Sequence, residues 1–177
     1  MILGKKIVQI DSVDSTSDEA RRLLKQGEGE GLVVIANQQT AGRGKPGSAW
    51  ASPPGNLYLS TVIKPYRNPA ALVPLTLLSA VAVRSALRRY AEISPVIKWP
   101  NDLMAGGKKL AGILVEGTGS GYLVIGIGVN LQIIPAELAG RATSLYAETG
   151  TMVEKDLFSS ALLQELDRCY LAYLSGF

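Results

Sequence analysis

The chain has 177 residues, a hydrophobic fraction of 47% and a formal net charge of +3, which together predict one compact soluble domain. It contains no His and a single Cys, which excludes Cys/His zinc sites, Ser-His-Asp triads, Cys-His dyads and any disulfide within the chain. The N-terminus lacks a signal-peptide pattern and no apolar run is long enough to cross a bilayer, so we expect a cytoplasmic protein without a membrane anchor.

The spacing of apolar residues and turn residues predicts alternating strands and helices. Ser15 or Thr16 can cap the first helix, and Asn68 with Pro69 can begin a second, longer one. In chain order, the expected elements are a strand over 6–11, a helix over 15–27, strands over 32–36 and 57–63, a helix over 68–90, strands over 96–99, 110–115 and 122–129, and a last helix ending at 174.

The end of the chain predicts a hairpin followed by a helix. The glycine-rich segment 117–121 joins the last two strands. Thr151 and Glu154 resemble a capping box, and Cys169 is expected to be a packing residue of the helix that follows. Strands that arrive singly and in a hairpin, with only two or three helices, predict an α+β fold, in which helices pack on a mixed, mainly antiparallel sheet.

The segment 41–50, AGRGKPGSAW, is the first candidate for a ligand site. Gly42, Gly44 and Gly47 have the spacing of a dinucleotide-binding turn, but two prolines and another strand follow where that turn needs a helix. A phosphate-binding P-loop is excluded because Ser48 stands where such a loop needs Lys.

A third interpretation of this loop is that it wraps an anion. Its small residues allow backbone N–H groups to approach a phosphate closely, and Arg43 and Lys45 add positive charge. Trp50 offers a flat face to an aromatic ring. Taken alone, the loop fits this role and that of an ordinary surface loop equally well.

Two further segments favour a ligand site. Lys98 follows an apolar strand and is expected to be partly buried beside Asn101 and Asp102, which favours an anionic partner. Gly126 and Gly128 lie inside a β-rich run, where glycines mark the close approach either of a ligand or of a tightly packed helix.

Seven short motifs, in order along nearly the whole chain, together resemble those of a known family. They read DSTSDEA, QQTAGRGKPGSAW, GNLYLS, KWPNDL, KKLAGILVE, GIGVN and TSL, and they resemble the catalytic domain of the biotin protein ligase family. The resemblance implies a fold related to class II aminoacyl-tRNA synthetases, in agreement with the predicted sheet. It also implies a single catalytic domain over 1–177, without an N-terminal helix-turn-helix domain or a C-terminal β-domain.

The resemblance implies an ATP-dependent ligase. Such an enzyme activates biotin as biotinyl-5′-AMP and transfers it to a lysine of a biotin carboxyl carrier domain. Biotin's carboxylate and ATP are both anions, so cations of the protein and Mg²⁺ must stabilise the charge, and His is not required. No sequence-specific DNA binding is expected. Family members are often homodimers, so a homodimer is one assembly that the resemblance allows.

The resemblance also assigns site residues to three roles. The catalytic cations are Arg43, Lys45 and Lys98. The biotin-binding residues are Ser15, Thr16, Ser17, Gln39, Arg43, Gly44, Lys45, Lys98, Gly112, Gly126 and Gly128. The nucleotide-binding residues are Arg43, Lys45, Trp50, Lys98, Asn101 and Asn130. No protein ligand is assigned to Mg²⁺. Lys109 is a weaker candidate, because an exposed, solvated lysine would explain it equally well.

The sequence departs from the family pattern at three positions. Lys45 and Ser48 stand where arginines are usual, and Ser17 stands where Asn is common. A lysine offers a point charge where arginine offers a bidentate fork, so a looser hold on the phosphate is expected. Two alternatives stay open: a lipoate or octanoate ligase or transferase of related fold, and a biotin sensor without catalytic activity.

Overall fold

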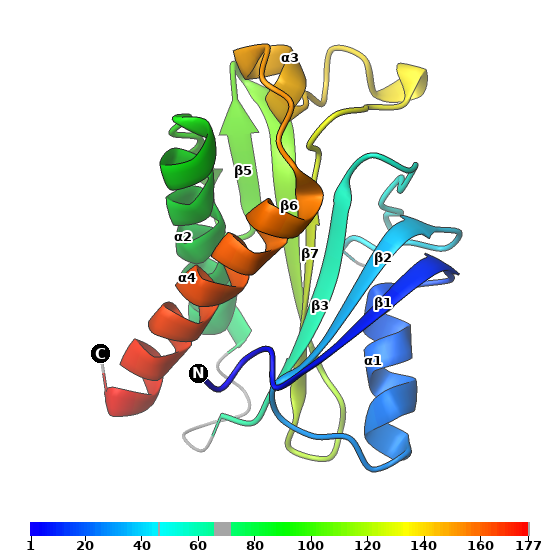
Figure 1. Ribbon diagram of the computed structural model, residues 1–177, viewed down its shortest axis with the longest axis vertical. Helices are drawn as coiled ribbons and strands as arrows, with labels where there is room; N and C mark the ends of the chain where they lie inside the picture. The colour runs from blue at the N-terminus through cyan, green and yellow to red at the C-terminus, as the bar shows by residue number, and fades with distance from the viewer. Residues whose placement is uncertain (46, 66–71, 177) are drawn as a thin grey trace.

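The structure is a computed structural model that describes residues 1–45, 47–65 and 72–176. Within these ranges a seven-stranded sheet has the order β1-β2-β3-β7-β6-β5-β4 (Figure 1). β1 and β2 pair in parallel and the other neighbours are antiparallel, so the predicted α+β class with a mixed, mainly antiparallel sheet is confirmed. The strands are β1 (Lys6–Val13), β2 (Leu32–Gln39), β3 (Leu57–Ile63), β4 (Val96–Lys98), β5 (Asp102–Ala105), β6 (Lys108–Gly117) and β7 (Leu123–Val129).

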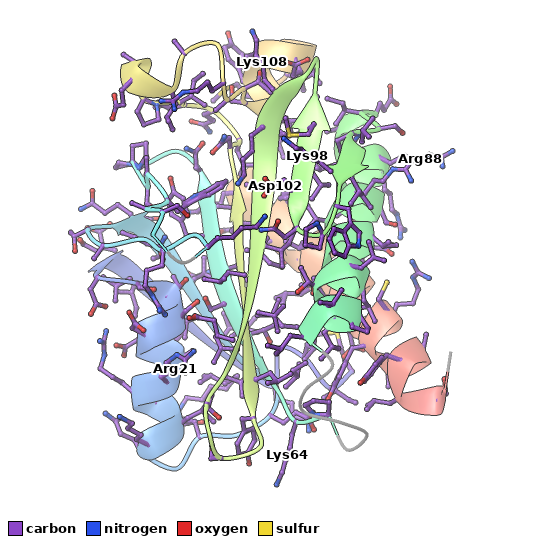
Figure 2. All side chains as sticks on the ribbon, turned by 180° about the vertical axis from the view of Figure 1, so that it is seen from behind. Arg21, Lys64, Arg88, Lys98, Asp102 and Lys108 are labelled. Carbon is purple, nitrogen blue, oxygen red and sulfur yellow. The ribbon has the colours of Figure 1, made fainter. Side chains whose placement is uncertain are left out.

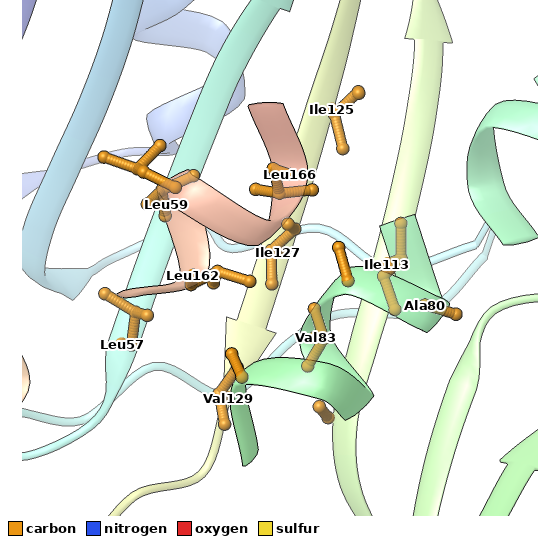
Figure 3. Packing of buried hydrophobic residues seen from close by; sticks show 14 of the residues in the cluster. Leu57, Leu59, Ala80, Val83, Ile113, Ile125, Ile127, Val129, Leu162 and Leu166 are labelled. Atoms are coloured by element: carbon orange, nitrogen blue, oxygen red, sulfur yellow. The ribbon is translucent and has the colours of Figure 1, made fainter. Parts of the chain in front are cut away.

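The helices cover the two faces of the sheet unequally. The long helices α2 (Leu72–Ala91) and α4 (Lys155–Ser175) lie on one face and pack against each other. Figure 3 shows Leu162 and Leu166 of α4 and Val83 of α2 packed over Leu59 of β3 and Ile127 of β7, which are all buried. The short α1 (Thr16–Lys25) lies on the other face through a smaller apolar cluster. This leaves part of the α1 face uncovered.

Alternating residues of the central strands separate the two faces. Ile113 and Ile127 belong to the core under α2 and α4. Because neighbouring side chains of a strand point to opposite faces, Gly112, Gly126 and Gly128 belong to the α1 face. The polar positions and glycines of the sequence therefore gather on the face that only α1 covers.

Several boundaries differ from the sequence-based expectations. β5 was not predicted, because the four residues 102–105 follow a turn too closely to show a strand pattern. The predicted capping box at Thr151 is wrong: α4 begins at Lys155, so Glu154 lies at the N-cap, one turn before the position a capping box needs. The expected start of α2 at Asn68 and Pro69 lies outside the described residues. Two short elements, a 3-10 turn Ala136–Leu138 and α3 (Leu145–Thr149), were also not predicted.

Cys169 is buried in the core, as the sequence predicts. Burial raises the pKa of its thiol, so the side chain acts as a packing group and not as a nucleophile. Among the described helices, none combines the length and the apolar character that crossing a bilayer would require.

Candidate active site

A cavity of about 160 Å³ opens on the α1 face of the sheet. The N-terminus of α1, the end of β2, the loop 42–50 and the glycines of β6 and β7 enclose it. Its lining residues are Ser15, Thr16, Ser17, Gln39, Arg43, Gly44, Lys45, Ser48, Ala49, Trp50, Asn101, Lys109, Gly112, Ile113, Leu114, Gly126, Ile127 and Gly128. Residues from five of the seven motifs of the sequence thus converge on one cavity.

A polar wall forms one side of the cavity. Gln39, at the end of β2, accepts hydrogen bonds from the backbone N–H and the hydroxyl of Thr16, at 2.8 and 3.1 Å. Its amide donates to the hydroxyl of Ser52 at 2.8 Å. The hydroxyls of Thr16 and Ser17 both contact the buried hydroxyl of Ser60, at 2.7 and 2.9 Å. These bonds fix the orientation of each polar group before any ligand arrives.

The start of α1 is held in place by a charged pair. Asp14 accepts a hydrogen bond from the backbone N–H of Ser15 at 2.7 Å and binds Arg22, which lies in the last turn of the helix. The Arg22 guanidinium holds the pKa of the Asp14 carboxyl at about 2, so this carboxyl stays ionised at neutral pH. Ser15 is buried at the N-cap position, but its side chain makes no capping hydrogen bond, which leaves its hydroxyl available to the cavity.

Glycines form the floor of the cavity for two different reasons. A Cβ added to Gly128 would lie 2.5 Å from Cε2 of Trp50, and one added to Gly112 would lie 2.8 Å from Cζ3 of the same indole. A Cβ at Gly126 would lie 2.8 Å from the Ser17 hydroxyl instead. Helix packing, one of the two alternatives raised by the sequence, is therefore found at Gly126, which admits the first turn of α1, whereas Gly128 admits the indole of the glycine loop. The close approach of a ligand stays a prediction.

The described parts of the loop, 42–45 and 47–50, fold back against each other beside the cavity. Arg43 and Ala49 form a β-bridge, and the N–H of Trp50 donates to the carbonyl of Gly42 at 2.9 Å. Gly42 has no space for a side chain, since a Cβ there would lie 2.5 Å from the Trp50 carbonyl oxygen. The N–H of Gly44 donates to the carbonyl of Ser48 at 2.9 Å. The described part of the loop is thus a compact turn and not an open coil.

The cations of the cavity differ from the predicted set in one respect. Arg43 and Lys45 line the cavity, as expected. Lys98 does not: it is exposed on β4, at the edge of the sheet, where Figure 2 shows it close to Asp102. The expectation that Lys98 is partly buried is wrong, because β4 is the outermost strand and nothing in the described ranges covers its side chain.

Lys109 is the third cation that lines the cavity. Its ammonium lies 2.8 Å from the Asp102 carboxylate and 5.1 Å from the centre of the Trp50 ring. Asp102 and Gly112 pair across β5 and β6, so the sheet register places Asp102 beside a glycine that lines the cavity. The sequence could not separate Lys109 from a solvated lysine, because the sheet register that places it at the cavity cannot be read from one strand.

Three buried side-chain atoms lack hydrogen-bond partners among the described residues. They are the side-chain oxygen of Asn101, the indole N–H of Trp50 and one carboxylate oxygen of Asp102, which lies in the ion pair with Lys109. Asn101 is only 7% exposed and its amide N–H group donates to the carbonyl of Ile113 at 3.0 Å. Buried polar atoms are nearly always paired, so one unpaired acceptor and one unpaired donor at this cavity indicate groups that a ligand completes.

A second cavity, also of about 160 Å³, lies beside the first. Trp50, Lys109 and Ala49 line both cavities, and Asn130 and Arg141 line only the second. The amide of Asn130 donates to the carbonyl of Thr143 at 3.0 Å, which ties the end of β7 to the following loop. Of the predicted site residues, Asn130 therefore lines only the second cavity and Lys98 lines neither cavity. All the others line the first cavity.

The sequence interpretation missed Ser60, whose hydroxyl joins Thr16 and Ser17. The signal that could have found it is a small polar residue in a mainly apolar strand that is buried on both faces. Among the described residues, no group of three or more His, Cys, Asp or Glu side chains could hold a metal ion.

A seven-stranded mixed sheet with a polar cavity beneath a basic glycine loop defines the class: an α+β ligand-binding domain whose site suits a small molecule with polar and anionic groups. Residues 9–130 match the model of the biotin/lipoate A/B protein ligase family. The chain therefore belongs to that family.

Named relatives agree with this membership. The bifunctional ligase/repressor BirA of Bacillus spizizenii is 33% identical over 98% of this chain and 56% of its own length. The biotin--[acetyl-CoA-carboxylase] ligase of Paracoccus denitrificans is 37% identical over 84% of this chain and 66% of its own length. The structure of the biotin protein ligase from Aquifex aeolicus in complex with biotin and ATP superposes with a TM-score of 0.88 at 31% identity, covering 97% of this chain and 73% of that one. The chain thus spans a little over half the length of the Bacillus relative.

Proposed function

We propose that this domain activates biotin with ATP to form biotinyl-5′-AMP and then transfers the biotinyl group to a lysine of a biotin carboxyl carrier domain. The observation that carries the proposal is the joining, in one cavity, of a fixed polar wall with the cations of a folded glycine loop. Relatives named as biotin ligases, one of them solved with biotin and ATP, support the choice of ligands. The cytoplasm is the compartment we propose, and assembly as a homodimer stays a prediction.

The polar wall suits the head of biotin. The ureido ring of biotin offers two N–H donors and one carbonyl acceptor, and the side chains of Ser15, Ser17 and Gln39 supply both kinds of group at the cavity wall. Gly126 and Gly128 let the Ser17 hydroxyl and the Trp50 indole lie directly on the sheet, where they form a floor for a flat ring. Because Ser17 and Gln39 are fixed by their own hydrogen bonds, little order needs to be created in these side chains when the ligand binds.

The cations suit the chemistry of activation. An oxygen of biotin's carboxylate attacks the α-phosphorus of ATP, the new bond is an acyl–phosphate bond, and pyrophosphate leaves with the electron pair of the broken bond. Arg43, Lys45 and Lys109 place three positive charges around the cavity where these anions meet, which stabilises the charge on the phosphoryl group. Lys98, exposed on β4, stays a candidate on the family resemblance alone.

We propose that Mg²⁺ binds together with ATP and is held by the phosphates of ATP. The described residues offer no carboxylate cluster for it, and Mg²⁺ in nucleotide sites is commonly held through substrate phosphates and water. When bound, it neutralises phosphate charge. The chain's own residues then hold the ligands, and the folded loop limits the access of water to the mixed anhydride.

Transfer to a carrier tests the proposal. The protein, biotin, ATP and Mg²⁺ are incubated with a biotin carboxyl carrier domain, and the carrier's intact mass is followed. We expect one biotinyl group on one lysine, and no addition when the acceptor lysine of the carrier is replaced by Arg. A carrier that keeps its original mass, under conditions in which the Paracoccus ligase modifies it, would rule the proposal out.

Changing Gly128→Ala is expected to weaken biotin binding about ten- to a hundredfold. The new Cβ would overlap the Trp50 indole, which must leave the cavity floor, and overpacking of this kind costs about 1–3 kcal/mol. Isothermal titration measures the affinity. Gly117→Ala is the matched control on β6, because a Cβ there lies 3.9 Å from its nearest neighbour and Gly117 has no left-handed backbone conformation. Equal affinities of the two variants would show that Trp50 does not shape the floor.

Changing Lys45→Gly is expected to leave biotin binding intact and to speed the release of biotinyl-5′-AMP about ten- to a hundredfold. Loss of one charge-assisted contact with the phosphate costs about 1.5–3 kcal/mol. Formation and release of the adenylate are measured separately by quenched-flow mass spectrometry and by trapping with free lysine. If the variant releases the adenylate no faster than the parent, the glycine loop does not retain it.

A further inference from the structure

Arg43 does not point freely into the cavity, because two carboxylates hold its guanidinium. Its Nη1 and Nη2 donate to the two oxygens of Glu116 on β6, at 3.0 and 2.9 Å, in a bidentate pair. Its Nη2 also donates to Asp18 on α1 at 2.8 Å. We call Arg43, Asp18 and Glu116 the arginine clamp. It joins the glycine loop to a helix and to a strand that are far from it in sequence.

Together with Arg21, the arginine clamp is balanced in charge, and it leaves donors for a ligand. Arg21 of α1 lies 3.4 Å from Glu116, so two arginines face two carboxylates. A guanidinium has five N–H groups, and three of the Arg43 groups are used by carboxylates of the clamp. Two N–H groups therefore stay available to a ligand in the cavity that Arg43 lines.

Holding Arg43 also holds the loop. Arg43 forms the β-bridge with Ala49, at the base of the turn, and Gly42 beside it accepts the hydrogen bond from Trp50. A restraint at this position therefore acts on both arms of the loop at once. Bidentate Arg–carboxylate pairs within a charge network are the surface ion pairs that contribute measurably, whereas isolated ones contribute little.

We propose that Asp18 and Glu116 are positioning residues for this site. They hold Arg43, and through it the loop 42–50, in the ligand-binding arrangement before the ligand arrives. The carboxylates do not touch the ligand and take no part in the chemical step. The effect of the arginine clamp on ligand binding rests on the proposed function, whereas its effect on the loop does not.

The effect on the loop is tested by trypsin. Within the loop, trypsin can cleave after Arg43, because Lys45 is followed by a proline and such bonds resist it. Cleavage requires the Arg43 side chain to leave both carboxylates and enter the protease. We expect Asp18→Asn and Glu116→Gln each to speed cleavage between residues 43 and 44 by about two- to fivefold, and the double variant by about tenfold, as followed by the peptides' masses.

Glu165→Gln is the matched control. Glu165 also pairs with two arginines, Arg168 at 2.7 Å and Arg89 at 3.8 Å, but it lies on α4, which covers the opposite face of the sheet. This control should leave cleavage after Arg43 unchanged. If Glu116→Gln and the parent are cleaved at the same rate, the arginine clamp does not hold the loop and the proposal is wrong, whatever the protein binds.

The effect on the ligand is tested with biotin. Loss of pre-organisation lowers the fraction of protein that is ready to bind, so Glu116→Gln should raise the Kd for biotin about two- to fivefold, with kcat for adenylate formation unchanged at saturation. A fall in kcat at unchanged Kd would contradict a positioning role, and so would an unchanged Kd with faster cleavage. If the parent protein binds no biotin but Glu116→Gln is still cleaved faster, the arginine clamp holds the loop as proposed. In that case the proposed function is wrong instead.

Discussion

Replacing Lys109 by Met is expected to slow the formation of biotinyl-5′-AMP by about a hundred- to a thousandfold. Lys109 lies beside Trp50 and, of the described cations that line either cavity, it alone lines both. Removing one pre-organised donor that faces developing negative charge typically lowers a rate by about this factor. Single-turnover mass spectrometry of the adenylate measures the rate, with biotin and ATP at saturation.

Lys108→Met is the matched control for this change. Lys108 is the preceding residue of β6, is exposed, and lines neither cavity (Figure 2). It should keep the parent rate. Lys98→Ala, measured in parallel, tests the expectation from the sequence that Lys98 supplies the positive charge for the activation step. A Lys109→Met protein as fast as Lys108→Met would remove Lys109 from the activation step.

Biotin is expected to bind at least about a thousandfold more tightly than lipoate. The wall that Thr16, Ser17 and Gln39 form with Ser60 is polar and fixed, and the dithiolane ring of lipoate has no N–H or carbonyl group to meet it. A site built to hydrogen-bond a polar group rejects an analogue without that group strongly, because its buried polar atoms are left unpaired.

Isothermal titration with each acid, without nucleotide, measures this preference. The measurement also separates the proposed ligase from the alternative of a lipoate or octanoate enzyme; lipoate is named beside biotin in the family's description. Comparable affinities for biotin and lipoate would contradict the assignment of biotin to the polar wall.

Much of the fold could be predicted from the sequence because its signals are local. The strand over 57–63 was found with its observed bounds, since an apolar β-rich run stands between turn residues. The hairpin of β6 and β7 was found because five glycine-rich residues join its strands. β5 was missed because it has only four residues, and Thr151 was predicted to be a cap because the start of α4 was placed a few residues too early. Residue propensities do not fix the ends of elements to within one or two residues.

The site was predicted less well where it depends on sheet register. The glycines and the serines and threonine of the DSTSDEA motif could be recognised as site residues from the sequence alone, and the structure brings them together in one cavity. Whether Lys98 or Lys109 reaches that cavity depends on how β4, β5 and β6 pair, which is a tertiary property. The same holds for the arginine clamp, because Asp18, Arg43 and Glu116 come from three distant segments and meet only in the fold.

The formation of biotinyl-5′-AMP in the absence of any carrier tests the central claim most directly. The protein is mixed with biotin, ATP and Mg²⁺, and the protein-bound small molecules are identified by mass spectrometry after denaturation. The account predicts biotinyl-5′-AMP in about one equivalent per active site, with release of pyrophosphate, and neither product when biotin is left out. Bound biotin and intact ATP without the adenylate would contradict it and would favour a sensor that binds its ligands without joining them.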